Sequence, residues 1–379
     1  MTDRVTIDGS FGEGGGQILR TSLALSALTG RELEMTNIRA RRSRPGLQPQ
    51  HLIAVKAAAE ICGAQVTGAQ LGSQRVVFAP GPVRPGVYRF DIGTAGSTGL
   101  VLHTLYLPLM LPGRGQSTVT ITGGTHVPMS PCFHYLDHQW RHFMERIGLP
   151  IELTMQSAGY YPRGGGAITA GIRMHADLAS ALQAPASQHA DMQHAVVPHT
   201  DMHATARVMP VNLAERGSLI EIRGLSSVTG LPMSIAERQK NQAHARLRSV
   251  GCPVTIDVVD VPGVGEGTML LLLAVFENGR ACYYGLGARG KRAEAVADEA
   301  ADQLLPMIRS RAAIDGHLAD QIVLPLAFAG GRSTISTPMI TQHLITNIEV
   351  IKHFVPARFD VVGEMGVEGT VIVEGLPVP

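Results

Sequence analysis

The feature that most limits the possible folds is a unit of two helices and a few short strands that recurs along the 379-residue chain. Recurrence at roughly 80 to 90 residues is typical of proteins built from repeated supersecondary units. The sequence therefore predicts an α/β protein made of repeated units. Hydrophobic periodicity gives strands 4–8, 33–39, 64–68 and 74–79 with helices 15–29 and 48–62; strands 87–91, 117–122, 150–156 and 166–172 with a helix ending near Met110 and helix 132–147; and helices 317–328 and 341–354 with strands 357–363 and 369–374.

Two stretches interrupt this recurrence. Residues 215–313 predict a separate α/β unit, with strand 218–224, helix 232–249, three more strands and helix 291–309. Ahead of this unit, the segment 173–206 is rich in Ala, His, Gln, Ser and Pro. A His-rich tract can bind a metal ion, but no apolar frame would fix its ligands here, so we favour a mobile low-complexity linker. The histidines of this region are His175, His189, His194, His199 and His203.

Composition excludes several classes of function. The net charge of +1 argues against a general nucleic-acid coat but allows a local basic pocket. Aromatic residues are only 4% of the chain, which disfavours extended platforms for base stacking. The four cysteines form no CxxC pair, which fits a reducing cytoplasm and gives no zinc site. We recognise no secretory signal, and the apolar runs 100–111 and 269–276 are too short to span a bilayer.

The loop 9–16 is the first candidate site. Its glycines surround Glu13, and a helix with Arg20 in its first turns follows at once. Glycine lets backbone N–H groups approach a ligand closely, and a helix N-terminus adds aligned donors and partial positive charge. The loop therefore predicts a phosphate site, with Glu13 placed to hold a metal ion. A tight strand-to-helix turn without a ligand is the alternative.

The second candidate is the segment 39–46, which places four arginines within six residues, just ahead of Gln50 and His51. Guanidinium groups bind phosphate oxygens in pairs and stay charged at any working pH. A solvated charged face is the usual explanation of such a run. Its position in a Pro-Gly loop before a buried helix favours a pocket for a phosphate or a nucleic-acid end.

The third candidate is His343. Thr341 can cap a helix, which places His343 in the first turn, where the positive helix end disfavours imidazolium. We therefore expect His343 to be neutral and nucleophilic near neutral pH, although a histidine in a helix is more often structural. Asp320 and Gln321, in the preceding helix, could orient His343 or a metal ion.

The motif Gly285–Gly290 matches the GxGxxG dinucleotide fingerprint and lies between a strand and a helix. With Lys291 it also matches GxxxxGK, but Arg292 stands where a magnesium-binding Ser or Thr is needed. No carboxylate about 20 residues further on ends a second strand, as ribose binding requires. We interpret this motif as a turn before a helix.

Several motifs carry a resemblance when they are taken together and in order. They are Phe11–Arg20, Ile38–Ala40, Pro45–Leu47, Gln50–Leu52, Gly93–Thr98, Gly123–Thr125, Tyr161–Gly166, His317–Gln321 and His343–Asn347. This combination resembles the RNA 3′-terminal phosphate cyclase family. The resemblance covers nearly the whole chain apart from the His-rich tract, and the combination is highly specific.

The resemblance implies a large domain of three repeated α/β units, each with two helices on a small sheet. A smaller α/β domain would be inserted before the third unit. In this sequence the large catalytic domain would comprise 1–214 and 314–379, and the inserted domain 215–313. The segment 173–206 would be extra length relative to the family pattern.

The resemblance also implies an enzyme that uses ATP and a divalent metal, Mg or Mn, to convert an RNA 3′-phosphate end into a 2′,3′-cyclic phosphate. His343 would attack the α-phosphate of ATP and become adenylylated. AMP would then pass to the RNA 3′-phosphate, and the vicinal 2′-OH would close the ring. The implied roles are metal binding for Glu13; phosphate or RNA-end binding for Arg20, Arg39, Arg42 and Gln50; and ATP binding for His103, Pro131, His317, Leu318, Ala319, Asp320 and Gln321.

Two residues depart from the family pattern. His103 stands where the family has a glutamine, and His317 stands where it has the aromatic residue that faces the adenine. An imidazole can still stack on a base, with Pro131 on its other side. The departures therefore concern nucleotide preference rather than the chemistry.

Two other functions are the alternatives. A cyclase-like ribosome biogenesis factor keeps the fold without the catalysis, but the presence of His343, Glu13 and the arginines favours the enzyme. A nucleotide-dependent enzyme built on Gly285–Gly290 would lose its activity when those glycines are changed. The sequence predicts a cytoplasmic protein without membrane association, and it leaves the physiological RNA, the preferred metal and the choice between monomer and homodimer open.

Overall fold

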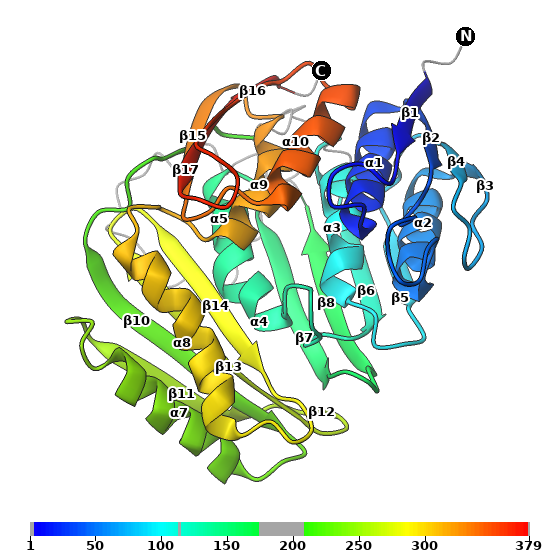
Figure 1. Ribbon diagram of the computed structural model, residues 1–379. Helices are drawn as coiled ribbons and strands as arrows, with labels where there is room; N and C mark the ends of the chain where they lie inside the picture. The colour runs from blue at the N-terminus through cyan, green and yellow to red at the C-terminus, as the bar shows by residue number, and fades with distance from the viewer. Residues whose placement is uncertain (1–3, 113–114, 174–207, 378–379) are drawn as a thin grey trace, which may run out of the picture.

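The computed structural model describes residues 4–112, 115–173 and 208–377. In this part of the chain, helices pack on four small sheets to form a mixed α/β structure (Figure 1). Residues 174–206 of the expected His-rich linker lie outside the described residues. Among the helices that the structure describes, none is long and apolar enough to cross a membrane.

The N-terminal elements are β1 (Arg4–Asp8), α1 (Gly16–Thr29), β2 (Glu32–Thr36), α2 (Pro49–Cys62), β3 (Gln65–Thr67) and β4 (Val76–Ala79). Helix α1 connects the parallel strands β1 and β2, and β4 is antiparallel to both of its neighbours. Left-handed glycines end both helices, namely Gly30 with φ 72° after α1 and Gly63 with φ 60° after α2.

Two further sheets have the same topology as the first. One contains β5 (Val87–Asp91), α3 (Thr98–Met110), β6 (Ser117–Gly123), α4 (Phe133–Tyr135), the π-helical turn η1 (Leu136–Trp140), α5 (Arg141–Arg146), β7 (Ile151–Gly159) and β8 (Gly166–Ile172). The other contains β9 (Asn212–Leu213), α9 (Gly316–Leu326), β15 (Gly331–Thr337), α10 (Gln342–Phe354), β16 (Arg358–Val362) and β17 (Gly369–Gly375). The orders β1-β2-β4-β3, β5-β6-β8-β7 and β9-β15-β17-β16 each begin with a parallel pair and continue with antiparallel pairs. The second sheet has a fifth strand, β12 (Gly263–Val264), which is parallel to β7.

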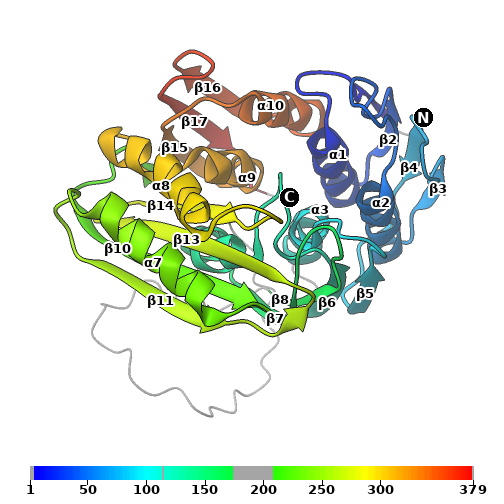
Figure 2. The same ribbon diagram turned by 60° about the horizontal axis from the view of Figure 1, so that its bottom comes forward.

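The fourth sheet has the order β11-β10-β13-β14. It is built from β10 (Leu219–Thr229), α7 (Met233–Leu247), β11 (Val254–Asp260), β13 (Gly267–Phe276), β14 (Arg280–Leu286) and α8 (Ala293–Arg309), while the short β12 (Gly263–Val264) pairs with β7. Helices α7 and α8 lie side by side on one face of this sheet (Figure 2). Strand β13 is apolar almost throughout because Leu270 and Leu272 pack under these helices, whereas Leu271 and Leu273 join the main core.

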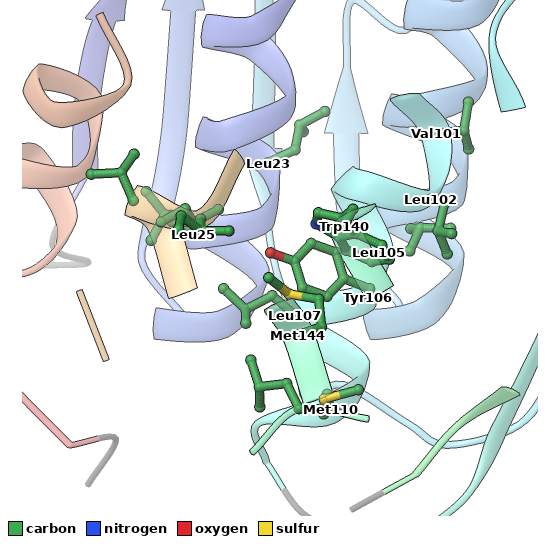
Figure 3. Close-up of a cluster of buried hydrophobic side chains, with 14 of the residues drawn as sticks. Leu23, Leu25, Val101, Leu102, Leu105, Tyr106, Leu107, Met110, Trp140 and Met144 are labelled. Atoms are coloured by element: carbon green, nitrogen blue, oxygen red, sulfur yellow. The ribbon is translucent and has the colours of Figure 1, made fainter. Parts of the chain in front are cut away.

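The main core is organised around α3, which is apolar on nearly every side. It packs against α1, α2, β6 and β8, as a helix buried in the interior does. Figure 3 shows Tyr106 of α3 against Trp140, and the centroids of these two rings are 5.0 Å apart. This packing fixes α1, and with it the loop that precedes α1, relative to α3.

The predicted elements are confirmed except at a few boundaries. Strand 33–39 was predicted too long: β2 ends at Thr36 because Asn37 and Arg39 have φ values of 51° and 54°, which cannot continue a strand. The predicted helix 132–147 contains the π-helical turn η1. The two-residue strand β9 is too short to leave a periodic signal, so the sequence did not predict it.

Candidate active site

Segments far apart in the sequence meet at one site: the loop 9–15 before α1, the loop 37–48 before α2, the helix α9 and the N-terminus of α10. The loop 9–15 lies directly against α10. A Cβ atom at Gly12 would lie 2.2 Å from Thr346 Oγ1, and Gly12 has a φ of 57°, which other residues rarely adopt. The predicted glycine-rich loop therefore serves first to bring α1 and α10 together.

His343 lies in the first turn of α10. Thr341 caps this helix, since its Oγ1 accepts a hydrogen bond of 2.9 Å from the backbone N–H of Leu344. Nδ1 of His343 is buried, has no hydrogen-bond partner among the described residues and lies 3.6 Å from Glu13 Oε1. The side chain as a whole is 46% exposed, so Nε2 is the ring nitrogen that an incoming phosphate can reach. Burial lowers the pKa of His343, an effect that Glu13 partly opposes, and the imidazole is thus neutral near neutral pH.

Glu13 connects the glycine-rich loop to the arginine-rich loop. Nη2 of Arg42 donates hydrogen bonds to the Glu13 carboxylate and, at 3.1 Å, to its backbone carbonyl oxygen. The other carboxylate oxygen faces His343. One side chain therefore contacts both the predicted nucleophile and a predicted phosphate-binding residue.

Arg20 and His51 occupy the space that Gly16 leaves open. A Cβ atom at Gly16 would lie 2.2 Å from His51 Nε2 and 2.8 Å from Arg20 Nη1. Burial lowers the pKa of Arg20 to about 10, so its guanidinium stays charged at neutral pH. Burial, together with the charges of Arg20 and Arg39, lowers the pKa of His51 to about 3, so His51 stays neutral.

Arg39 has a different environment from the other predicted phosphate-binding arginines. Its Nη1 donates hydrogen bonds to the backbone carbonyl oxygens of Arg44 and, at 3.2 Å, Gly46. This nitrogen therefore holds the arginine-rich loop in shape. Arg39 lies close enough to Arg42 and Glu13 for their charges to influence its pKa, which burial lowers.

A buried network connects α9 and α10 to α1. Thr341 Oγ1 donates to Asp320 Oδ1 at 2.5 Å, and Asn347 Nδ2 donates to the Asp320 carbonyl oxygen at 2.7 Å. Thr21 of α1 donates to Asn347 Oδ1 at 2.7 Å. Burial raises the pKa of Asp320 to about 8, so this carboxyl group carries a proton at neutral pH.

The predicted ATP-binding residues lie in two kinds of environment. His317 is exposed and lies edge-on to Tyr283, with ring centroids 6.3 Å apart, whereas Leu318 and Ala319 are completely buried. The latter two could therefore contact a nucleotide only through their backbone. Pro131 is partly buried at the start of the segment that leads into α4.

Two further predicted ATP-binding residues have buried polar atoms without partners. Nε2 of His103 and Oε1 of Gln321 have no hydrogen-bond partner among the described residues. His103 packs against Trp140 with ring centroids 5.0 Å apart, and burial and the nearby Arg20 lower its pKa to about 3. Buried polar atoms without partners often mark a place that a ligand or water fills.

Gln50 lies at a different part of the site from the arginines. Its Oε1 accepts a hydrogen bond of 2.9 Å from the backbone N–H of Ser97. Its side chain lines a pocket of about 320 Å³ with Ala95, Leu100, Tyr161 and the turn 127–130. The structure thus brings Glu13, Arg20, Arg42 and His343 together, whereas the side chain of Gln50 faces Ser97 and this pocket.

The carboxylate of Glu13 is the candidate metal ligand at this site. Among the residues that the structure describes, no group of three or more His, Cys, Asp or Glu side chains is arranged to hold a metal ion. Glu13 alone fits a magnesium-type site, because Mg²⁺ is often bound through one or two carboxylates with substrate phosphates and water as its other ligands. Glu13 therefore fits a metal that arrives with a triphosphate.

The motif Gly285–Gly290 is a turn before a helix, as predicted. A Cβ atom at Gly285 would lie 2.1 Å from the carbonyl oxygen of Val296 in α8, so this glycine lets α8 pack directly on β14. Lys291 donates at 2.8 Å to the carbonyl oxygen of Leu286 and pairs with Glu299. Close packing of α8 on β14 therefore explains why this motif contains a glycine at position 285.

The sequence did not assign roles to His51 and Asn347. His51 Nδ1 accepts a hydrogen bond of 3.3 Å from the backbone N–H of Gln48, which closes a capping box at the start of α2 and turns Nε2 towards Arg20. The sequence signal for this capping box was the spacing of Gln48 and His51, three residues apart at the start of a helix. Asn347 lies one turn after His343, at helical spacing, but its partners on α1 and α9 depend on the tertiary structure.

Known proteins are similar to this chain over nearly its whole length. Residues 11–361 match the family model described as RNA 3′-terminal phosphate cyclase. An RNA 3′-terminal phosphate cyclase of Pseudomonas fluorescens is 44% identical over 361 residues, which is 94% of each chain. Proteins with the same description from Pyrobaculum aerophilum and Methylococcus capsulatus are 40% and 42% identical and cover 98% of this chain and 98% and 96% of their own. The chain belongs to the RNA 3′-terminal phosphate cyclase family.

Proposed function

We propose that the protein is an ATP-dependent RNA 3′-phosphate cyclase that works through a covalent His343–AMP intermediate. Family membership supports the overall reaction. The observation that carries the role of His343 is its geometry: Nδ1 is buried 3.6 Å from Glu13 Oε1, while the side chain as a whole is 46% exposed.

In the first step, Nε2 of neutral His343 attacks the α-phosphorus of ATP and pyrophosphate leaves with the electrons of the broken P–O bond. A neutral imidazole is a competent nucleophile. The imidazole gains positive charge as the N–P bond forms, and Glu13 beside Nδ1 stabilises that charge. Arg20 and Arg42 then face the phosphates of the substrate.

In the second step, an oxygen of the RNA 3′-phosphate attacks the phosphorus of the His343–AMP bond, which transfers AMP to the RNA and frees the imidazole. The vicinal 2′-OH then attacks the 3′-phosphorus, closes the cyclic diester and releases AMP. Guanidinium groups stabilise the charge on phosphoryl oxygens in such displacements. Arg39 contributes mainly by holding the loop that carries Arg42.

A divalent cation, Mg or Mn, would supply charge neutralisation for the triphosphate and the leaving pyrophosphate. Glu13 would hold it. The adenosine would lie near α9, with His317 and Pro131 on either side of the base, and the backbone of Leu318 and Ala319 nearby. The buried side chains of His103, Asp320 and Gln321 would line the inner side of this adenosine pocket.

The same proposal includes the domain organisation. Residues 1–214 and 314–379 form one domain of three repeated units, and residues 215–313 form the inserted domain. The shared strand order of three of the sheets supports this division. A cytoplasmic location is also part of the proposal and fits four cysteines that form no disulfide.

The reaction is tested with an RNA oligonucleotide that ends in a 3′-phosphate. Incubation with the protein, ATP and Mg or Mn should make the terminal phosphate resistant to phosphatase, and an RNA with a 3′-OH end should be unchanged. Omission of ATP should abolish the product. If the wild-type protein yields no cyclic phosphate with any common divalent metal, the non-catalytic ribosome biogenesis role is the better account.

A further inference from the structure

Asp315 is a completely buried residue to which the proposed reaction gives no role. It caps α9, since its Oδ1 accepts a hydrogen bond of 2.9 Å from the backbone N–H of Leu318. The same oxygen accepts from Tyr135 Oη at 2.8 Å. The other oxygen, Oδ2, accepts from Gln139 Nε2 at 2.7 Å and from the backbone N–H of Cys282 at 3.2 Å. One carboxyl group therefore connects α4, η1, β14 and α9.

Capping of α9 does not by itself require this arrangement. A serine or threonine caps a helix with a single oxygen, as Thr341 does at the start of α10. Burial of a carboxyl group is unfavourable unless hydrogen bonds satisfy it. Three of the four groups that donate to Asp315 lie outside α9, on α4, η1 and β14. Asp315 therefore holds the start of α9 against these other elements in addition to capping it.

The contact with β14 lies beside the residues proposed to hold adenosine. Cys282 of β14 donates to Asp315, and the next residue, Tyr283, lies edge-on to His317 with ring centroids 6.3 Å apart. Tyr283 is buried, whereas His317 is exposed in the first turn of α9. A shift of this turn along β14 would move both the imidazole of His317 and the backbone of Leu318. The contact between Asp315 and β14 therefore fixes the position of two groups proposed to contact the nucleotide.

We propose that Asp315 is a positioning residue of the adenosine pocket, which fixes the first turn of α9 against β14 and η1 and thereby sets the affinity for ATP. The proposal rests on the cyclase function proposed above. The strand β14 of the fourth sheet would contribute to nucleotide binding through the main-chain hydrogen bond from Cys282. The proposed phosphate-binding residues lie on other elements, Arg20 on α1 and Arg42 ahead of α2. Binding of the phosphates should therefore not depend on Asp315.

The test measures the two ends of the nucleotide site separately. Equilibrium dialysis with labelled ATP and a divalent metal measures nucleotide binding in the His343→Ala background, in which the proposed covalent bond cannot form. Competition by inorganic triphosphate in the same assay measures binding of the phosphates alone. Adenylylation at saturating ATP, in proteins that retain His343, measures the chemical step.

The main variant is Asp315→Ser, which keeps an oxygen to cap α9 but loses the hydrogen bonds to the other elements. It should raise the Kd for ATP about 5- to 150-fold, the range expected when buried donors are left without a partner. The Kd for triphosphate should not change. The adenylylation rate at saturating ATP should also stay at the wild-type value, because Asp320 still connects α9 to α10, which carries His343.

Two further variants complete the test. Tyr135→Phe removes one donor and leaves Asp315 and its cap intact, so it should raise the Kd for ATP in the same direction but less. Gln239→Ala is the matched control, because Gln239 is also a completely buried polar residue. Its side chain bonds to Thr268 and Ser226 at 2.8 Å, away from α9. This control should lower the melting temperature and leave the Kd values for ATP and triphosphate unchanged.

An unchanged Kd for ATP in Asp315→Ser and Tyr135→Phe would overturn the proposal, and Tyr135→Phe alone decides if Asp315→Ser does not fold. Equal rises in the Kd values for ATP and triphosphate, or the same rise for ATP in Gln239→Ala, would also overturn it, because the effect would then be general. Failure of the proposed cyclase function has a separate signature, since the wild-type protein would then form no adduct. The dialysis measurement would still decide the role of Asp315, and a protein that bound no ATP would exclude that role as well.

Discussion

The loop 9–16 and the loop 285–290 look alike in sequence, since both are rich in glycine and both precede a helix. In the first loop, a Cβ atom at Gly16 would meet the side-chain ends of His51 and Arg20. In the second, a Cβ atom at Gly285 would meet the backbone of α8. In the first loop, the space beside the glycine is occupied by charged and polar side chains, one of them from another element. In the second loop, it is occupied by the backbone of the helix that follows the loop. The group that fills the space beside a glycine therefore distinguishes a binding loop from a packing turn.

The largest expected effect is at Gly16. Gly16→Ala should slow adenylylation about 100-fold or more, because displacement of catalytic groups by about 1 Å can have an effect of that size. The displaced atoms are the ends of side chains rather than backbone, so the melting temperature should fall less than in Gly285→Ala. The matched control is Gly86→Ala, because Gly86 has no positive φ and the added Cβ would come no closer than 3.4 Å to its nearest neighbour, Tyr88. A fully active Gly16→Ala variant would remove the distinction between the two loops.

The next effect is at Glu13. Glu13→Ala removes the partner of both Arg42 and His343, and loss of such an orienting partner typically reduces activity about 10- to 100-fold. Single-turnover adenylylation measures the effect. Glu34 is the control, because it is also a carboxylate paired with an arginine, Arg75, but lies on β2. An equal loss in Glu34→Ala would point to destabilisation rather than to a role in the site.

The third prediction concerns Gly285. Gly285→Ala should destabilise the protein by about 1–3 kcal/mol, because the added Cβ would lie 2.1 Å from a backbone oxygen of α8. Chemical denaturation gives the free energy of unfolding, and adenylylation well below the unfolding transition should stay near the wild-type rate. Lost adenylylation in a folded Gly285→Ala variant would support a nucleotide site at this loop.

The fourth prediction concerns the pH dependence of stability at Asp320. Its pKa is 3.8 in the unfolded reference and about 8 in the folded protein, so the folded state retains a proton that the unfolded state loses. This contribution is complete below about pH 4 and declines as the pH rises towards about 8. Asp320→Asn should remove that decline in the free energy of unfolding, while the amide oxygen can still accept from Thr341. An identical pH profile in both proteins would show that Asp320 is ionised when folded.

The sequence predicted most elements because each has strong periodicity and clear ends, such as the glycines after α1 and α2. It predicted β2 too long, because a left-handed Asn37 is not visible in a hydrophobic pattern. It also named Glu13, Arg20, Arg42 and His343, which the structure brings together.

The sequence was less informative where a residue's role depends on the direction of its side chain. Four arginines in the segment 39–44 look equivalent, yet Arg39 directs Nη1 to its own loop while Arg42 reaches Glu13. Leu318 and Ala319 lie in a predicted binding motif but are completely buried. Such differences depend on contacts between distant segments, and these form only in the folded chain.

The central claim is that His343 forms the covalent bond to AMP. The most direct measurement is to incubate the protein with α-labelled ATP and a divalent metal, denature it and determine the label that stays on the protein. We expect acid-labile, protein-bound AMP in the wild type and in His353→Ala, whose exposed histidine lies at the other end of α10, and none in His343→Ala. No adduct in the wild type with any common divalent metal, or an undiminished adduct in His343→Ala, would contradict the account.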